Sequence, residues 1–211
     1  MVEIVPAILP KSFEELSRGL KRLSGIAPLI QIDLVEKNVL AGQETIPMWE
    51  EFDFEADIML PNPQQEVRHC IDLGFSKIVV HADALGAREA LTMLQETREG
   101  TFATRVGVAL QSTDSPEALT EFEGLFDYVQ VMGIERIGSQ GQPFDQSSIT
   151  LIKELREQFP ELVIQVDGAV APNVREFVAA GANRLVVGSA IMSAENPREV
   201  YKALYTEANG S

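Results

Sequence analysis

Cysteine is almost absent from this sequence. Among its 211 residues, Cys70 is the single cysteine. One cysteine excludes an internal disulfide bond and any metal site built from several cysteines. Val67 and Ile71 flank it at positions that suggest one face of a helix, so we interpret Cys70 as a buried core residue.

Long apolar runs are absent as well. No run reaches the roughly 18 apolar residues that a membrane-spanning helix needs. The first ten residues, MVEIVPAILP, lack the basic start and the apolar centre of a secretory signal. We therefore expect no membrane partner and a cytoplasmic location.

Basic residues are scarce relative to acidic ones. The chain has 17 Lys and Arg against 32 Asp and Glu, and its formal net charge is −15. Nucleic acids and anionic membranes bind clustered basic side chains, so neither is expected as a partner. A phosphorylated ligand would have to be held mainly by backbone N–H groups. The acidic run of Glu50, Glu51, Asp53 and Glu55 is interpreted as a solvated surface.

Short apolar segments alternate with amphipathic ones along the chain. This alternation is typical of parallel strands joined by helical crossovers. The expected strands are Glu3–Ile8, Leu29–Leu34, Ala56–Leu60, Lys77–His81, Arg105–Leu110, Tyr128–Met132, Val163–Asp167 and Arg184–Gly188. The expected helices are Ser12–Leu23, Pro63–Leu73, Ala87–Arg98, Pro116–Phe122, Gln146–Gln158, Asn173–Ala180 and Pro197–Tyr205.

Eight such units predict one α/β domain over residues 1–211, closed as a (β/α)8 TIM barrel. An open doubly wound sheet is the alternative, but no GxGxxG motif follows the first strand. Asn62-Pro63 and Asn196-Pro197 each predict a cap residue before a proline at the first helical position. After the second strand, only Pro47–Phe52 has a helical pattern.

Two strands carry acidic residues at their ends. Gln31 and Asp33 share one side of LIQIDL, and Gln165 and Asp167 share one side of VIQVDG. The apolar side of each strand should meet the helices, so both aspartates are expected to point into the barrel at its C-terminal mouth, where active sites form.

The same parity places His81 and Met132 at the mouths of the fourth and sixth strands. Asp33 and Asp167 are candidates for an acid/base pair, and the alternative is that each caps the loop that follows it. His81 is either a structural histidine or a site residue.

Glycines follow the last three strands. They are Gly168, Gly188 with Ser189, and the glycines of Gly138–Phe144, which include Gly141. Loops of this kind hold phosphate through backbone N–H groups in barrels. We expect a phosphate-binding site on this side of the mouth, although glycines also simply form turns.

The chain carries, in this order, the segments VPAILPKSFEEL, QIDLVEKNVL, ADIMLPNPQQEV, KIVVHAD, VGVAL, YVQVM, GSQGQPF, IQVDGAVAPNV and AGANRLVVGSAI. Each resembles the corresponding segment of the ribulose-phosphate 3-epimerase family, and the last two do so most closely. The resemblance covers almost the whole chain. It implies a TIM barrel that epimerises C3 of a ketopentose 5-phosphate, with a phosphorylated sugar as its partner.

The resemblance also implies roles for particular residues. Asp33 and Asp167 match the acid and base that exchange the proton at C3. Met132 matches a methionine near the substrate, and His81 matches a histidine of the fourth strand. The phosphate would be held by backbone groups of the last three loops, at Gly141, Gly168, Gly188 and Ser189.

The metal site departs from the family pattern. Family enzymes bind a divalent metal through two aspartates and two histidines, but Gln31 and Met59 stand at the two histidine positions. Asp33 and Asp167 would remain as metal ligands. Imidazole suits Zn and Fe, whereas carboxylates and amides suit Mg and Mn, so binding of any of these metals is expected to be weakened. Ala7 also replaces a serine that contacts the substrate.

Three functions stay open at this point. The first is an epimerase with an altered or absent metal. The second is a related sugar-phosphate decarboxylase or aldolase, although ADIMLPNP has no lysine and Lys77 begins its strand at the end away from the mouth. The third is a barrel that binds a phosphorylated ligand without fast chemistry. A homo-oligomer is compatible with each.

Overall fold

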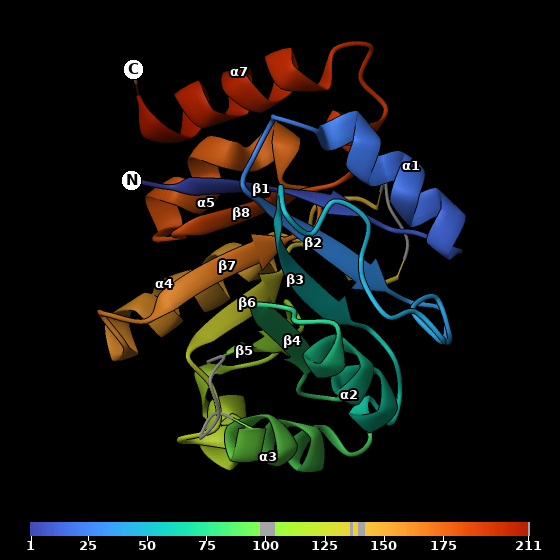
Figure 1. The fold of residues 1–211 in the computed structure, drawn as a ribbon. Helices are drawn as coiled ribbons and strands as arrows, with labels where there is room; N and C mark the ends of the chain where they lie inside the picture. Colours follow the sequence, from blue (N-terminus) through green and yellow to red (C-terminus); the bar gives the residue numbers. More distant parts are fainter. Residues whose placement is uncertain (98–103, 136, 139–141, 211) are drawn as a thin grey trace.

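The computed structural model describes residues 1–97, 104–135, 137–138 and 142–210. In these ranges, eight parallel strands pair in chain order, and β1 pairs with β8 to close the barrel (Figure 1). The predicted (β/α)8 TIM barrel is therefore confirmed. The strands are β1 Glu3–Ile8, β2 Leu29–Leu34, β3 Asp53–Ile58, β4 Lys77–His81, β5 Arg105–Leu110, β6 Tyr128–Met132, β7 Val163–Asp167 and β8 Arg184–Val187.

Helices surround these strands (Figure 1). They are α1 Phe13–Leu23, α2 Gln64–Asp72, α3 Ala87–Thr97, α4 Ser147–Gln158, α5 Val174–Ala180, α6 Ser189–Met192 and α7 Pro197–Asn209. Pro116–Phe122 and Ala171–Asn173 form 3-10 turns, so the predicted helix after β5 is of the tighter type. The other ends agree within a residue or two, except that α7 continues past Tyr205; Arg98 lies outside the described residues.

The connection from β2 to β3 differs from the prediction. Residues 47–51 form turns instead of a helix, and Met48 has a φ of 63°, which interrupts a right-handed helix. β3 begins at Asp53, opposite Leu29 of β2, and ends at Ile58 instead of spanning Ala56–Leu60. The neighbouring strand sets this register, which the acidic residues of the first half of β3 concealed.

The two predicted Asn-Pro caps have different outcomes. Asn196 caps α7, since its Oδ1 accepts a hydrogen bond from the Glu199 amide at 3.4 Å. Asn62 instead has a left-handed φ of 57°, and Pro63 occupies the cap position without a side-chain hydrogen bond. A capping residue needs an extended backbone, so the prediction for Asn62 is wrong.

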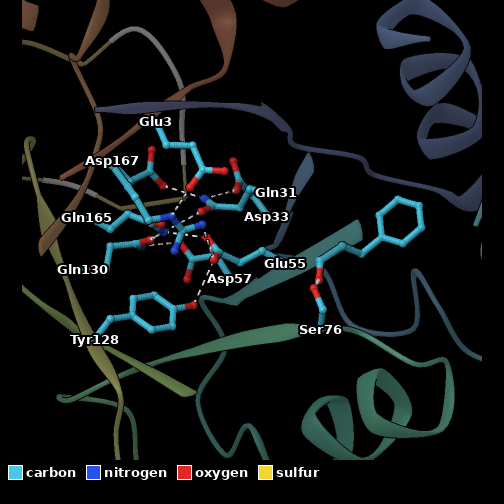
Figure 2. Close-up of polar contacts among 12 residues, drawn as sticks. Glu3, Gln31, Asp33, Glu55, Asp57, Ser76, Tyr128, Gln130, Gln165 and Asp167 are labelled. Carbon is cyan, nitrogen blue, oxygen red and sulfur yellow. Dashed lines mark hydrogen bonds and ion pairs between the residues drawn. The ribbon is translucent and has the colours of Figure 1, made fainter. Parts of the chain in front are cut away.

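The outer faces of the strands are apolar and the inner faces are polar. Ile30, Ile32 and Leu34 of β2 belong to the core that the barrel shares with its helices. Cys70 of α2 is fully buried in the same core, which confirms its predicted place. Inside the barrel, buried amides and acids form a hydrogen-bonded network (Figure 2).

Glu55 belongs to this inner network, which corrects the interpretation of the acidic run as a surface. The Glu55 side chain is fully buried, and its Oε2 accepts from Arg184 Nη2 at 2.8 Å and from Tyr128 Oη at 3.0 Å. A buried carboxylate requires such partners. Alternation along β3 places Glu55 inward, while Glu50 and Asp53 stay exposed.

None of the helices in the described ranges is long and apolar enough to cross a membrane.

Candidate active site

Asp33 and Asp167 meet at the C-terminal mouth of the barrel, as the strand parity predicts. Asp33 lies near the end of β2 and is 5% exposed, and Asp167 is the last residue of β7. The Gln31 amide joins them, since its Nε2 donates to Asp33 Oδ1 at 2.9 Å and to Asp167 Oδ2 at 3.1 Å (Figure 2). The two carboxylates therefore form one hydrogen-bonded unit.

Asp57 of β3 is a third carboxylate of this site, and the sequence analysis missed it. One oxygen each of Asp33, Asp57 and Asp167 lie within 4.8 Å of one another. The alternation of Asp53, Glu55 and Asp57 along the strand could have revealed it, because all three share the side that points inward.

Asp57 is fully satisfied by neutral or cationic donors. Its Oδ1 lies 3.0 Å from His81 Nε2, and its Oδ2 accepts from Gln130 Nε2 at 2.7 Å. His81 is buried, and burial alone would lower its pKa, but the charge of Asp57 and the hydrogen bond to it raise the pKa overall. His81 thus contacts a site carboxylate and does not line the cavity described below.

Burial and mutual repulsion favour protonation of the aspartate pair. Burial raises the pKa of Asp33 well above its usual range, and the charges of Asp167 and Asp57 raise it further. Burial likewise raises the pKa of Asp167 to about 7, helped by the charge of Asp57 and opposed by the Gln31 hydrogen bond. Near neutral pH the pair therefore holds a proton, which is the state an acid/base pair needs.

A cavity of about 370 Å³ opens above the pair. Asp33, Asp167 and Met132 line it, as do Gly168 after β7 and Gly188 with Ser189 after β8. The predicted residues around the mouth are thus brought together, with the exception of Gly141, which lies outside the described residues. The cavity is also bordered by Ala7, Leu9, Met59, Ile134, Phe144 and Val170.

Close backbone approach shapes the loops after β6 and β7. The Gly133 amide donates to the Asp167 carbonyl at 2.6 Å, and a Cβ on Gly133 would collide with the Gly168 carbonyl oxygen. Gly168 has a φ of 100°, a left-handed conformation that favours glycine. These glycines bring the loop after β7 directly over Asp167.

The donor set at the mouth does not fit the metal site that the resemblance implies. Gln31 presents N–H donors to the carboxylates in place of an imidazole lone pair, and Met59 offers a thioether, which is a soft ligand. The three carboxylates are close enough to share a cation. However, Gln31, Gln130 and His81 already supply hydrogen-bond donors or a cationic partner to them.

Stability should depend on pH through this pair. In the unfolded chain Asp167 ionises near pH ~3.9, whereas in the folded protein it stays protonated up to about pH 7. The folded protein binds more protons in between, so its stability falls as the pH rises from about 4 to 7. Asp167→Asn should remove this fall and raise stability at pH 8 by on the order of 1–3 kcal/mol.

Urea denaturation from pH 4 to pH 8 in the presence of a chelator measures this effect. Asp72→Asn, at the exposed end of α2, is the matched control and should follow the parent protein at each pH. Equal pH dependence in parent and Asp167→Asn proteins would show that Asp167 titrates normally.

Comparison with known proteins assigns the chain to a family. Residues 3–192 match the profile of the ribulose-phosphate 3 epimerase family. Ribulose-phosphate 3-epimerase of Schizosaccharomyces pombe is 26% identical over 214 residues, covering 96% of this chain and 92% of the relative. The cytoplasmic isoform of Oryza sativa subsp. japonica is 28% identical over 221 residues, covering 99% and 95%.

Solved structures agree on the fold. A 3-hexulose-6-phosphate synthase has a TM-score of 0.71 at 17% identity, covering 96% of this chain and 98% of the other. KGPDC from Streptococcus mutans has a TM-score of 0.72 at 13% identity, covering 100% and 98%. At such identities these structures support the barrel alone. The profile match and the relatives that align along nearly the whole length establish that the chain belongs to the ribulose-phosphate 3-epimerase family, whose named members are isomerases.

Proposed function

We propose that this protein epimerises C3 of a ketopentose 5-phosphate, with Asp33 and Asp167 exchanging the proton. The observation that carries the proposal is the meeting of two largely buried carboxylates, from β2 and β7, on the floor of a cavity at the barrel mouth. Strand-end carboxylates in TIM barrels are placed where active sites form. Family membership supplies the reaction class.

The chemistry requires one ionised and one protonated aspartate. The ionised carboxylate takes the proton from C3, and the electrons of the broken C–H bond form the C2–C3 double bond of an enediolate. The protonated aspartate then returns a proton to C3 from the opposite face, which gives the epimer. The raised pKa of Asp33 and that of Asp167, about 7, allow this division of states near neutral pH.

Between the two transfers both carboxyl groups are protonated. A buried carboxylic acid can donate a hydrogen bond to a developing oxyanion, so the pair itself supports the enediolate. Gln31 keeps the two groups in place through its hydrogen bonds to both. Met132 lines the cavity beside them and would pack against the sugar.

The phosphate would lie at the loops after β7 and β8. Gly168, Gly188 and Ser189 line the cavity, and Gly188 precedes the first turn of α6, whose N–H groups point away from the helix. Gly141 remains part of the proposal from sequence alone. Substrate contact by His81 also stays a prediction. A structural neighbour, KGPDC from Streptococcus mutans, was solved in complex with D-ribose 5-phosphate, which agrees with a phosphorylated sugar as ligand.

Product analysis tests the proposal. The purified protein should convert D-ribulose 5-phosphate to D-xylulose 5-phosphate, followed by NMR of the sugar signals. Absence of product at any pH from 6 to 9, with a folded protein by circular dichroism, would contradict it. Release of formaldehyde or carbon dioxide from a sugar phosphate would instead favour the lyase alternative.

A negative charge at Ser189 should weaken phosphate binding. Ser189 is exposed and lines the cavity where the phosphate is proposed to lie. Ser189→Glu would repel the substrate phosphate and is expected to raise KM by about tenfold or more, with a smaller change in kcat. Thr206→Glu, on the exposed face of α7, introduces the same charge away from the cavity and should leave KM unchanged.

The lyase alternative has less support from the structure. Its Schiff-base form needs a lysine at the mouth, and Lys77 starts β4, at the opposite end of the strand from His81. Structural neighbours include a 3-hexulose-6-phosphate synthase and an orotidine 5'-monophosphate decarboxylase, but they share the fold only.

Location and assembly follow from the family as proposals. The Oryza relative is named a cytoplasmic isoform and the Arabidopsis thaliana relative is named chloroplastic, and we propose the cytoplasm for this chain. We also propose that residues 1–211 act as one domain, which can assemble as a homo-oligomer. Trp49, 63% exposed, is an apolar side chain that such an assembly could cover.

A further inference from the structure

We propose that the Gln31 amide, oriented by a buried chain of hydrogen bonds from Glu55, takes the place of a metal ion between Asp33 and Asp167. The site would then work without a resident divalent cation. The inference concerns the same site as the proposed epimerisation, and it deepens that function by naming Gln31 as a positioning residue and Glu55 as the origin of its orientation.

The first step is the contact between Gln31 and the aspartate pair. Nε2 of Gln31 lies 2.9 Å from Asp33 Oδ1 and 3.1 Å from Asp167 Oδ2. A primary amide has two N–H donors, so each carboxylate receives one. Two negatively charged groups that a cation would otherwise hold together are held here by a neutral donor.

The second step is the neighbour that fixes which way the Gln31 amide points. Gln165 Nε2 donates to Gln31 Oε1 at 3.0 Å and to Glu55 Oε1 at 2.6 Å. An ionised carboxylate can only accept hydrogen bonds. Glu55 therefore requires the N–H side of Gln165, and Gln165 in turn requires the carbonyl side of Gln31. The N–H side of Gln31 is left to face the aspartates.

The third step is the origin of the negative charge on Glu55. Arg184 Nη2 lies 2.8 Å from Glu55 Oε2, and Tyr128 donates to the same oxygen at 3.0 Å. A buried arginine paired in this way stays charged and keeps its partner ionised. The orientation of Gln31 at the mouth is thus linked to an ion pair deeper in the barrel (Figure 2).

The consequence is exclusion of a cation from the pair. A metal ion needs carboxylate lone pairs, and those toward Gln31 already accept its N–H groups. For the amide to bind a metal through Oε1 it would have to turn over, which would place two N–H groups of Gln31 and Gln165 against each other. The chain of hydrogen bonds opposes that rotation.

Binding of Mn²⁺ to the whole protein tests the first part. Gln31→Glu replaces the N–H donors by an oxygen of the same shape, and it should tighten Mn²⁺ binding by about 10- to 100-fold relative to the parent protein, measured by calorimetric titration. Gln158→Glu adds the same charge at the exposed end of α4 and should leave binding unchanged. The parent protein should emerge from purification without stoichiometric metal by elemental analysis.

Glu55→Gln tests the second part. It releases Gln165 and so the Gln31 amide, and Mn²⁺ affinity should increase by about tenfold. The control is Glu3→Gln, because Glu3 also pairs with Arg184, at 3.1 Å, but bonds only to it. Glu3→Gln should bind Mn²⁺ as weakly as the parent. Equal affinity of the Glu55→Gln and parent proteins would refute the orienting chain.

Stoichiometric metal in the parent protein, or Mn²⁺ binding as tight as in Gln31→Glu, would overturn the substitution of metal by amide. If Gln31→Glu proves unfolded, the metal content of the parent still decides the question. These measurements do not use turnover. A metal-free but inactive protein would contradict the proposed function alone, whereas an active protein with bound metal would contradict this inference alone.

Discussion

Asp33→Asn and Asp167→Asn should each reduce kcat for epimerisation of D-ribulose 5-phosphate by about 10²- to 10⁴-fold, the contribution typical of a positioned acid or base. An asparagine keeps the shape and can still accept the hydrogen bond from Gln31 Nε2, which lies 2.9 Å from Asp33 Oδ1. It can neither take nor return a proton at C3. The loss should therefore appear in kcat, with a small change in KM.

The double variant distinguishes a proton-exchanging pair from two independent groups. Because both transfers belong to one turnover, Asp33→Asn combined with Asp167→Asn should be little worse than either single variant. Asp72→Asn, which removes a carboxylate at the exposed end of α2, should retain full activity. If either single variant keeps the activity of the parent, that aspartate is not part of the mechanism.

Arg184→Met should destabilise the protein by about 3–5 kcal/mol, because it leaves Glu55 charged and fully buried without its cation. Arg184 also lies 5.3 Å from the centre of the Tyr128 ring, and the substitution removes this contact. Chemical denaturation at pH 7 measures the change. The parent and the variant should unfold with similar m-values.

Two further variants interpret that loss. Arg175→Met breaks an ion pair with Glu207 in which the two side chains are 83% and 38% exposed, so it should cost less than about 1 kcal/mol. Combining Arg184→Met with Glu55→Gln should restore part of the stability, since no buried charge then remains unpaired. A double variant as unstable as Arg184→Met alone would mean that packing, and not charge, dominates at this position.

The sequence predicted the barrel and most of its mouth because both depend on local pattern. Alternation of apolar and polar residues in LIQIDL and VIQVDG placed Asp33 and Asp167 inward, and the structure brings them onto one amide. The register of β3 was not local. It depends on pairing with β2 from Leu29 to Leu34, so the inward positions of Glu55 and Asp57 were assigned wrongly or overlooked.

The partners of buried polar groups were also beyond the sequence. Gln165 and Gln31 lie 134 positions apart in the chain yet are joined by a hydrogen bond of 3.0 Å. Replacement of a metal-binding histidine by Gln31 suggested a weakened metal site, but the direction of the amide depends on Glu55, which was interpreted as a surface residue. Only the closed barrel shows that these residues share one network.

Exchange of the C3 proton with solvent tests the central claim most directly. The metal-free protein would be incubated with D-ribulose 5-phosphate in D₂O, and deuterium at C3 followed by NMR with the Asp33→Asn variant in parallel. We predict that deuterium enters C3 along with formation of xylulose 5-phosphate, and that the variant shows neither. A parent protein that binds the sugar phosphate but leaves its C3 proton unexchanged would contradict the assignment of Asp33 and Asp167 as the acid/base pair.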